Sequence, residues 1–128
     1  VKGDANFIYT GQNTKKLKIH YGAKTGSVVT YFSGLDGQDT FDVMSPSNKN
    51  CDGILLEDVE ADGYGYVQLN GNISSTMLGE TDTSDWVLGD LLKPNENTYL
   101  LEKTTDLRLA VARVLFIIDS VAYIKLFN

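Results

Sequence analysis

The two residues best suited to nucleophilic chemistry, His20 and Cys51, are each the only one of their type in the 128-residue chain. A catalytic cysteine needs a histidine within hydrogen-bond reach and a third group that orients the imidazole. The spacing of this pair does not predict that contact, and His20 shares a strand face with Lys18 in the alternating run 17–21, which favours a solvated side chain. Cys51 follows the polar residues 48–50, which offer little to stabilise a thiolate. We therefore predict no catalytic residue and no enzymatic activity.

Acidic residues gather in two clusters, Glu57, Asp58, Glu60 and Asp62 in one and Asp36, Asp39 and Asp42 in the other. A calcium loop needs carboxylates at alternating positions and a closing glutamate, and neither cluster has that pattern. We interpret both clusters as turn residues and solvated strand faces. Residues 22–26 begin and end with glycine, but they lack the spacing of a phosphate-binding loop. The sequence therefore predicts neither a metal nor a cofactor.

The acidic balance of the chain argues against nucleic acid as a partner. Seventeen acidic and eleven basic residues give a formal net charge of −6 at pH 7, whereas a phosphate backbone attracts clustered lysine and arginine. The one basic stretch consists of Lys15, Lys16 and Lys18. We interpret it as a solvated strand edge, where lysine discourages pairing with another strand. The alternative is a small basic patch that meets an acidic partner.

The apolar segments are too short or too interrupted for membrane insertion. Residues 1–6 contain no apolar core of a signal peptide. The richest apolar stretch, residues 107–118, is interrupted by Arg108 and Arg113 and is shorter than a bilayer span. The single cysteine excludes an internal disulfide framework. We expect a soluble protein with no membrane partner.

Short runs of β-branched and aromatic residues, separated by glycine, aspartate and asparagine, predict an all-β fold. The expected strands are residues 17–21, 27–32, 40–44, 53–56, 64–69, 72–73, 86–88, 91–92, 99–101, 110–118 and 121–127. Their close spacing favours a single small antiparallel β-sandwich or β-barrel domain. We divide the chain into residues 1–25, a polar N-terminal arm or an additional strand, and residues 26–128, the β module.

Four segments required a choice between local structures. Residues 107–118 place apolar side chains at a helical period, but residues 114–118 have no polar face, which is typical of a buried strand. Asn70-Gly71 is either a two-residue hairpin turn or a glycine bulge within one bent strand. Asp119-Ser120 predicts a hairpin turn, and residues 83–85 predict a single helical turn before Trp86.

A series of short motifs follows in order between residues 26 and 126 of the chain. The segments are Gly26-Ser27-Val28-Val29-Thr30-Tyr31, Gly53-Ile54-Leu55-Leu56-Glu57-Asp58-Val59, Gly63-Tyr64-Gly65-Tyr66-Val67, Gly71-Asn72-Ile73, Leu88-Gly89-Asp90-Leu91-Leu92, Ala110-Val111-Ala112-Arg113-Val114-Leu115 and Ser120-Val121-Ala122-Tyr123-Ile124. Together they resemble a small β module of tailed-bacteriophage virion proteins, a group that includes capsid decoration proteins, head fibres and tail-fibre segments. Residues 93–97 and Ala112 depart from the module, which has a glycine-rich turn and a glycine at these places.

The resemblance implies a structural function without chemistry. It implies a capsid decoration, or cement, protein that bridges subunits of the major capsid protein and thereby stabilises the head shell. It also implies a homotrimer on the capsid surface of the virion, assembled in the cytoplasm of the bacterial host, with the polar residues 1–14 threaded onto a neighbour. The alternatives are a segment of a head fibre or tail fibre and, from another class, a small enzyme or a small carbohydrate-binding domain that uses Trp86.

Overall fold

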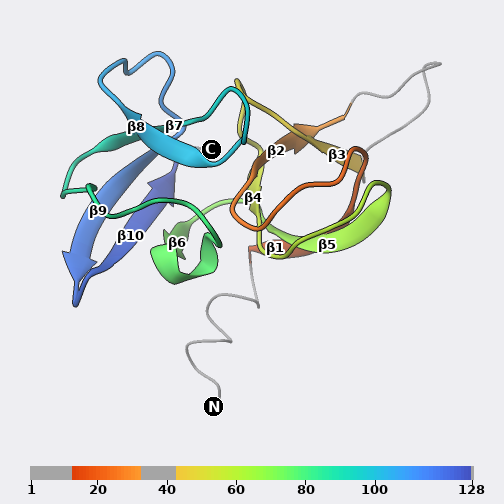
Figure 1. Cartoon of the computed structure of the whole chain (residues 1–128), viewed down its shortest axis with the longest axis horizontal. Helices are drawn as coiled ribbons and strands as arrows, with labels where there is room; N and C mark the ends of the chain where they lie inside the picture. The colour runs from red at the N-terminus through yellow and green to blue at the C-terminus, as the bar shows by residue number, and fades with distance from the viewer. Residues whose placement is uncertain (1–12, 33–42, 128) are drawn as a thin grey trace.

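The computed structural model describes residues 13–32 and 43–127, which form two β units that lie side by side (Figure 1). The strands are β1 (Thr14–Ile19), β2 (Val28–Tyr31), β3 (Val43–Pro46), β4 (Gly53–Leu55), β5 (Gly63–Gln68), β6 (Asn72–Ser74), β7 (Leu91–Pro94), β8 (Leu101–Thr104), β9 (Ala112–Ile118) and β10 (Val121–Leu126). Within this part of the chain, a 3₁₀ turn, η1 (Ser75–Met77), is the only helical element. The prediction of a small all-β fold is confirmed.

Three features predicted from the sequence lie wholly or partly outside the described residues. They are the first twelve residues of the expected arm, residues 40–42 of an expected strand, and the acidic cluster Asp36, Asp39 and Asp42. Within the range 1–25, the structure describes residues 13–25, of which Thr14–Ile19 form β1.

The first unit is a closed barrel with the strand order β1-β3-β2-β4-β5, in which β5 pairs back with β1. Its neighbouring strands are antiparallel except β1 and β3, which run parallel with Lys18 opposite Val43. This parallel pair differs from the antiparallel arrangement that we expected. The parallel pair arises because β3 runs antiparallel to β2 on one side and pairs with β1 on the other.

The basic stretch lies on the barrel strand β1, which pairs with β5 along its length. Among the described residues, β1 pairs with β3 only at Lys18 and Ile19, so the edge interpretation is wrong for Lys18, which lies between two strands. Lys15 and Lys16 are solvent exposed, as expected for lysine. The Lys16 Nζ lies 5.7 Å from the centroid of the Tyr66 ring on β5, within the range of a cation–π contact.

The second unit is an antiparallel sheet with the order β6-β10-β9-β7-β8. The connection between β9 and β10 is the hairpin turn that the sequence predicts, with positive φ angles of 52° at Asp119 and 67° at Ser120. Residues 112–118 form a strand, which confirms the choice of strand over helix. Residues 106–109 before it form a turn, in which the Leu109 N–H donates to the Asp106 carbonyl.

Three local predictions are wrong. Asn70-Gly71 is neither a hairpin turn nor a bulge, because β5 pairs with β1 and β4 whereas β6 pairs with β10. The dipeptide instead carries the chain from the barrel to the second sheet, with Gly71 at φ +86°. Residues 86–88 do not form the expected strand. A hydrogen-bonded turn precedes Trp86, in which the Trp86 N–H donates to the Thr83 carbonyl over 3.2 Å, but it is not the helical turn that the sequence predicts.

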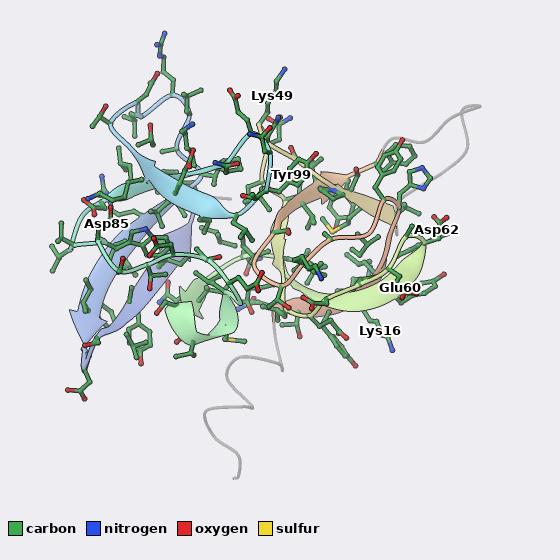
Figure 2. The ribbon with its side chains drawn as sticks, in the orientation of Figure 1. Lys16, Lys49, Glu60, Asp62, Asp85 and Tyr99 are labelled. Atoms are coloured by element: carbon green, nitrogen blue, oxygen red, sulfur yellow. The ribbon has the colours of Figure 1, made fainter. Side chains whose placement is uncertain are left out.

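The barrel strands β2 and β4 are buried on both faces, so their side chains enter the cores of both units. Val28 and Ile54 point into the core beneath the second sheet, and the adjacent Val29 and Leu55 point into the barrel. This explains why these strands are continuous apolar runs in the sequence. A hydrogen bond also joins the two units, because the Val28 N–H donates to the Tyr99 carbonyl over 2.8 Å. Figure 2 labels Tyr99, which lies where the two units meet.

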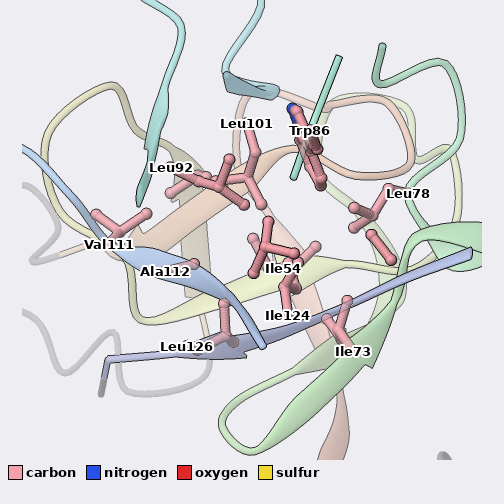
Figure 3. Close-up of a cluster of buried hydrophobic side chains, with 13 residues drawn as sticks. Ile54, Ile73, Leu78, Trp86, Leu92, Leu101, Val111, Ala112, Ile124 and Leu126 are labelled. Carbon is pink, nitrogen blue, oxygen red and sulfur yellow. The ribbon is translucent and has the colours of Figure 1, made fainter. Parts of the chain in front are cut away.

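The core beneath the second sheet is the larger of the two clusters (Figure 3). Its buried members are Val28, Ile54, Ile73, Leu78, Trp86, Leu92, Leu101, Val111, Ala112, Val114, Ala122, Ile124 and Leu126. The barrel core contains Leu17, Ile19, Val29, Met44, Leu55 and Val67. Both clusters are formed by alternate residues of the strands, so the opposite faces of β9 and β10 point away from the core.

Candidate interaction surface

His20 lies at one end of the barrel, in contact with aromatic and acidic residues. Its Nδ1 is 3.1 Å from Asp62 Oδ1, and its ring stacks on Phe32 with a centroid distance of 4.6 Å. Lys18 Nζ is 4.0 Å from the same carboxylate oxygen, so Lys18 and His20 share a face as predicted. The His20 side chain is half-buried, at 31% exposed, so it is less solvated than we expected.

Cys51 lies elsewhere, against the core beneath the second sheet. Its Sγ donates to the Gly53 carbonyl over 3.5 Å. Loss of hydration on burial, offset in part by the Gly53 hydrogen bond and aided by the neighbouring Asp52 carboxylate, raises the pKa of the Cys51 thiol to about 12. The thiol is therefore protonated at neutral pH, and its contacts have no residue in common with those of His20.

The carboxylates of residues 57–62 stabilise loop conformations. Glu57 Oε2 accepts from the Tyr66 N–H over 2.8 Å. Asp58 Oδ1 accepts from both the N–H and the hydroxyl of Thr25, each over 2.8 Å, and these bonds lower the pKa of Asp58. Among residues 13–32 and 43–127, no three His, Cys, Asp or Glu side chains lie close enough together to hold a metal ion.

Trp86 belongs to the core and is only 5% exposed. Sugars bind proteins by stacking on an exposed aromatic face, and this face is covered. The role that the sequence suggested for Trp86 in a carbohydrate-binding domain therefore has no accessible surface in this conformation.

One shallow depression of about 400 Å³ lies where the loop before β4 meets the second sheet. Its lining residues are Asn48, Lys49, Asn50, Lys93, Pro94, Glu96, Arg108 and Leu109. Two of its three cations have acidic partners, because Lys93 pairs with Glu102 at 3.2 Å and Arg108 with Asp106 at 3.1 Å. This depression therefore presents little uncompensated charge to a ligand.

The outer half of the β9–β10 hairpin is the most unusual surface in the described part of the chain. β7 pairs with β9 only at Ala112 and Arg113, and the loop before β7 reaches Val114 through two backbone bonds with Gly89 and Asp90. Beyond that point the hairpin projects from the sheet (Figure 1). Residues 114–118, which the sequence predicted to be buried, lie largely in this projecting part.

The prediction of burial is wrong for the end of β9. Phe116 and Ile117 are each 38% exposed, and Ile118 is 54% exposed. The prediction failed because the run has no polar residue, yet the covering strand β7 ends its pairing too early to bury it. The end of β9 therefore has the composition of a buried strand but lies on the surface.

One face of the projecting hairpin is apolar throughout. Ile118 pairs with Val121 and Phe116 with Tyr123, which places these four side chains on the same face. The rings of Phe116 and Tyr123 stack with centroids 4.9 Å apart. We call this face, together with the two cations described next, the hairpin surface.

Two cations border the apolar face. Lys125 lies directly opposite Arg113 in the β9–β10 register, and both are exposed. Like charges directly opposite each other destabilise a strand pair. No ion pair joins either cation to an acidic group within residues 13–32 and 43–127. This pair was not predicted from the sequence because it depends on a register shift between Tyr123 and Ile124. Counting from the Asp119-Ser120 turn without that shift would place Val114, and not Arg113, opposite Lys125.

The described residues contain no helix long and apolar enough to cross a membrane. Comparison of the sequence with family models and curated proteins, and of the fold with solved structures, found no match.

Proposed function

We propose that this chain is a non-enzymatic structural protein of a bacteriophage virion, namely a capsid decoration protein that bridges subunits of the major capsid protein. The observation that carries the proposal is the exposed, uncharged end of β9. Its composition is typical of a protein interior, yet Phe116, Ile117 and Ile118 lie on the surface. Apolar surfaces of this kind mark sites where proteins associate.

The phage assignment and the homotrimer are supported by the motif order over residues 26–126. The motifs fall on strands of both units, with β4 and β5 in the barrel and β6, β7, β9 and β10 in the second sheet. The resemblance therefore concerns the strand framework and not one loop. The non-enzymatic part is supported by the separation of His20 from Cys51 and by the protonated thiol.

A decoration protein stabilises a capsid through the surface that it buries, and it needs no catalytic residue. A protein seated across a seam between capsid subunits adds buried surface to both subunits, so their separation requires these additional contacts to break. A specific interface of standard size buries roughly 1,600 Å² in total. Repetition of the contact over a symmetric shell lets a modest affinity at each seam stabilise the whole particle.

The proposal is tested by mixing the purified full chain with mature capsids that lack it and imaging the product. We expect symmetric density on the shell and a higher temperature of capsid disruption. The variant Phe116→Asp/Ile118→Asp should bind less, whereas Leu107→Asp, which alters an exposed apolar residue outside the hairpin, should bind normally.

The same images separate the other assignments. Density confined to the neck or tail would favour a head-fibre or tail-fibre segment over decoration of the shell. Absence of the protein from every part of the virion would contradict the phage assignment itself.

A further inference from the structure

A second surface, opposite in charge to the cation pair, lies at the end of the barrel between β4 and β5. Residues 57–62 contain four carboxylates and no cation. Three of the carboxylates accept bonds from barrel residues, as described above. The fourth, that of Glu60, is exposed and makes no hydrogen bond or ion pair with the described residues. Glu60 and Asp62 lie at the edge of the barrel in Figure 2.

This end of the barrel is hollowed and carries an exposed aromatic ring. A depression of about 590 Å³ is lined by Tyr21, Gly22, Ala23, Lys24, Asp58, Val59, Glu60 and Ala61. Tyr21 is 67% exposed, which is a large aromatic surface to leave in water. We call residues 57–62 together with Tyr21 the barrel-end surface. The exposed Lys24 lies beside it and acts on the Asp58 carboxylate.

We propose that the hairpin surface of one copy binds the barrel-end surface of a second copy of this chain. The two surfaces are opposite in net charge, because the four carboxylates of residues 57–62 outnumber the neighbouring Lys18 and Lys24. Among the described residues, Arg113 and Lys125 pair with no acidic group, and Glu60 pairs with no basic group. Both surfaces also present apolar and aromatic side chains beside the charge, with Phe116 on one and Tyr21 on the other. Complementary charge directs two surfaces toward each other and fixes their orientation, while the apolar area supplies affinity.

The acidic net charge makes this pairing selective. Two copies of a chain with a charge of −6 repel each other in most orientations. A contact that places the two cations against the acidic loop replaces repulsion with attraction. It also removes the mutual repulsion of Arg113 and Lys125, which face each other across the hairpin.

In a homotrimer the contact is head-to-tail, since its two surfaces belong to different units of the fold (Figure 1). Each copy therefore offers one hairpin surface and one barrel-end surface, and a suitable rotation closes such contacts into a ring. The inference deepens the homotrimer part of the proposed function and rests on it only for the number of copies. It does not require a capsid. Because the ring covers the hairpin surface of each copy, Phe116→Asp/Ile118→Asp would lower capsid binding through loss of the oligomer.

The first test is the mass of the full chain in solution, measured by light scattering over a range of concentrations. We expect a concentration-dependent oligomer that dissociates as salt is added. The variant Arg113→Glu/Lys125→Glu should lower the association constant by at least roughly a hundredfold, because it sets like charges against each other. The control Lys49→Glu/Arg108→Glu makes the same change in net charge at exposed residues elsewhere and should associate as the wild type does.

The barrel-end surface is tested by its own variant and matched control. Glu60→Lys should weaken association, whereas Glu96→Lys, at an exposed glutamate that lines a different depression, should not. Each variant is first checked for an unchanged circular dichroism spectrum and thermal midpoint. A wild type that stays monomeric at all concentrations would overturn the inference, as would an oligomer that tolerates the changes at Arg113 and Lys125.

The contact itself is identified by carbodiimide cross-linking, which joins a carboxylate directly to a neighbouring amine. In a mixture of ¹⁴N and ¹⁵N protein, we expect mixed-isotope peptides that link Lys125 to residues 57–62. Intermolecular links only at other sites would reject these surfaces even if the chain forms an oligomer. If the chain does not bind capsids but forms the expected cross-links, capsid decoration is rejected and the self-association stands.

Discussion

The ring of Phe116 stacks on the ring of Tyr123 across the β9–β10 hairpin, with a centroid distance of 4.9 Å and 24° between the ring planes. The two residues are opposite each other in the strand register. The stack holds both side chains in one arrangement before any partner arrives, which reduces the conformational entropy lost on association. The hairpin surface is therefore preorganised for binding.

Replacement of Phe116 by alanine should have a small effect on the monomer. An aromatic pair contributes about 1 kcal/mol beyond area burial, whereas a fully buried phenylalanine contributes about 3–5 kcal/mol. We expect Phe116→Ala to lower the free energy of unfolding by about 1 kcal/mol, measured by urea titration at a protein concentration that keeps the chain monomeric. A loss above about 3 kcal/mol would mean that Phe116 is core material.

Ile54 should be among the residues most sensitive to truncation. It is fully buried on β4, where the barrel meets the core of the second sheet. Ile54→Ala should lower the free energy of unfolding by about 2–5 kcal/mol, because it leaves a cavity that both units line. The matched control Ile118→Ala, at an exposed residue of the same type, should change it by about 0.5 kcal/mol or less. Equal losses in urea titrations of the two variants would contradict this assignment of the core.

Cys51 should be chemically inert in the folded chain. Burial raises its pKa to about 12 from the ordinary 9.0, and only the thiolate reacts with alkylating reagents. We expect iodoacetamide to modify the native protein at pH 8 at least roughly a hundredfold more slowly than the urea-unfolded chain. Comparable rates in the two states would show that the thiol is exposed in solution.

The same pKa shift sets a direction for stability at high pH. The unfolded chain releases the Cys51 proton near pH 9.0, while the folded chain retains it until about pH 12. The contribution of the Cys51 thiol to the free energy of unfolding is therefore fully present below pH 9.0. It falls between pH 9.0 and about 12, since the unfolded state then binds fewer protons than the folded state. Thermal midpoints of wild type and Cys51→Ala should converge across this window, and parallel curves would reject the linkage.

The Asp119-Ser120 turn should accept residues that suit its backbone better. Both residues have positive φ angles, which asparagine and glycine adopt with less strain. Asp119→Asn/Ser120→Gly should raise the free energy of unfolding by about 0.5–1 kcal/mol in a urea titration. As a control, Ser84→Gly lies in a turn where the residue has no positive φ, so it should give no gain. Destabilisation by the double change would argue against this turn geometry.

The sequence by itself determined the class of structure and several of its local features. The Asp119-Ser120 turn was predictable because it depends on the φ preferences of two adjacent residues. The strands β2 and β4 were predictable from the short runs of β-branched and apolar residues at 27–32 and 53–56. Signals of this kind are contained within a few neighbouring residues, so they need no knowledge of the rest of the chain.

Only the tertiary structure decided which strands meet and where they stop. Asn70-Gly71 marked a change of direction, but the choice of β10 as the partner of β6 depends on residues some fifty positions later. The exposure of Phe116 depends on how far β7 pairs along β9, and the meeting of Arg113 with Lys125 depends on the hairpin register. Periodicity and propensity report the preferences of a segment, whereas burial and juxtaposition are set by long-range pairing. For that reason the sequence indicated the strand at residues 112–118, and the fold determined that its end forms a surface.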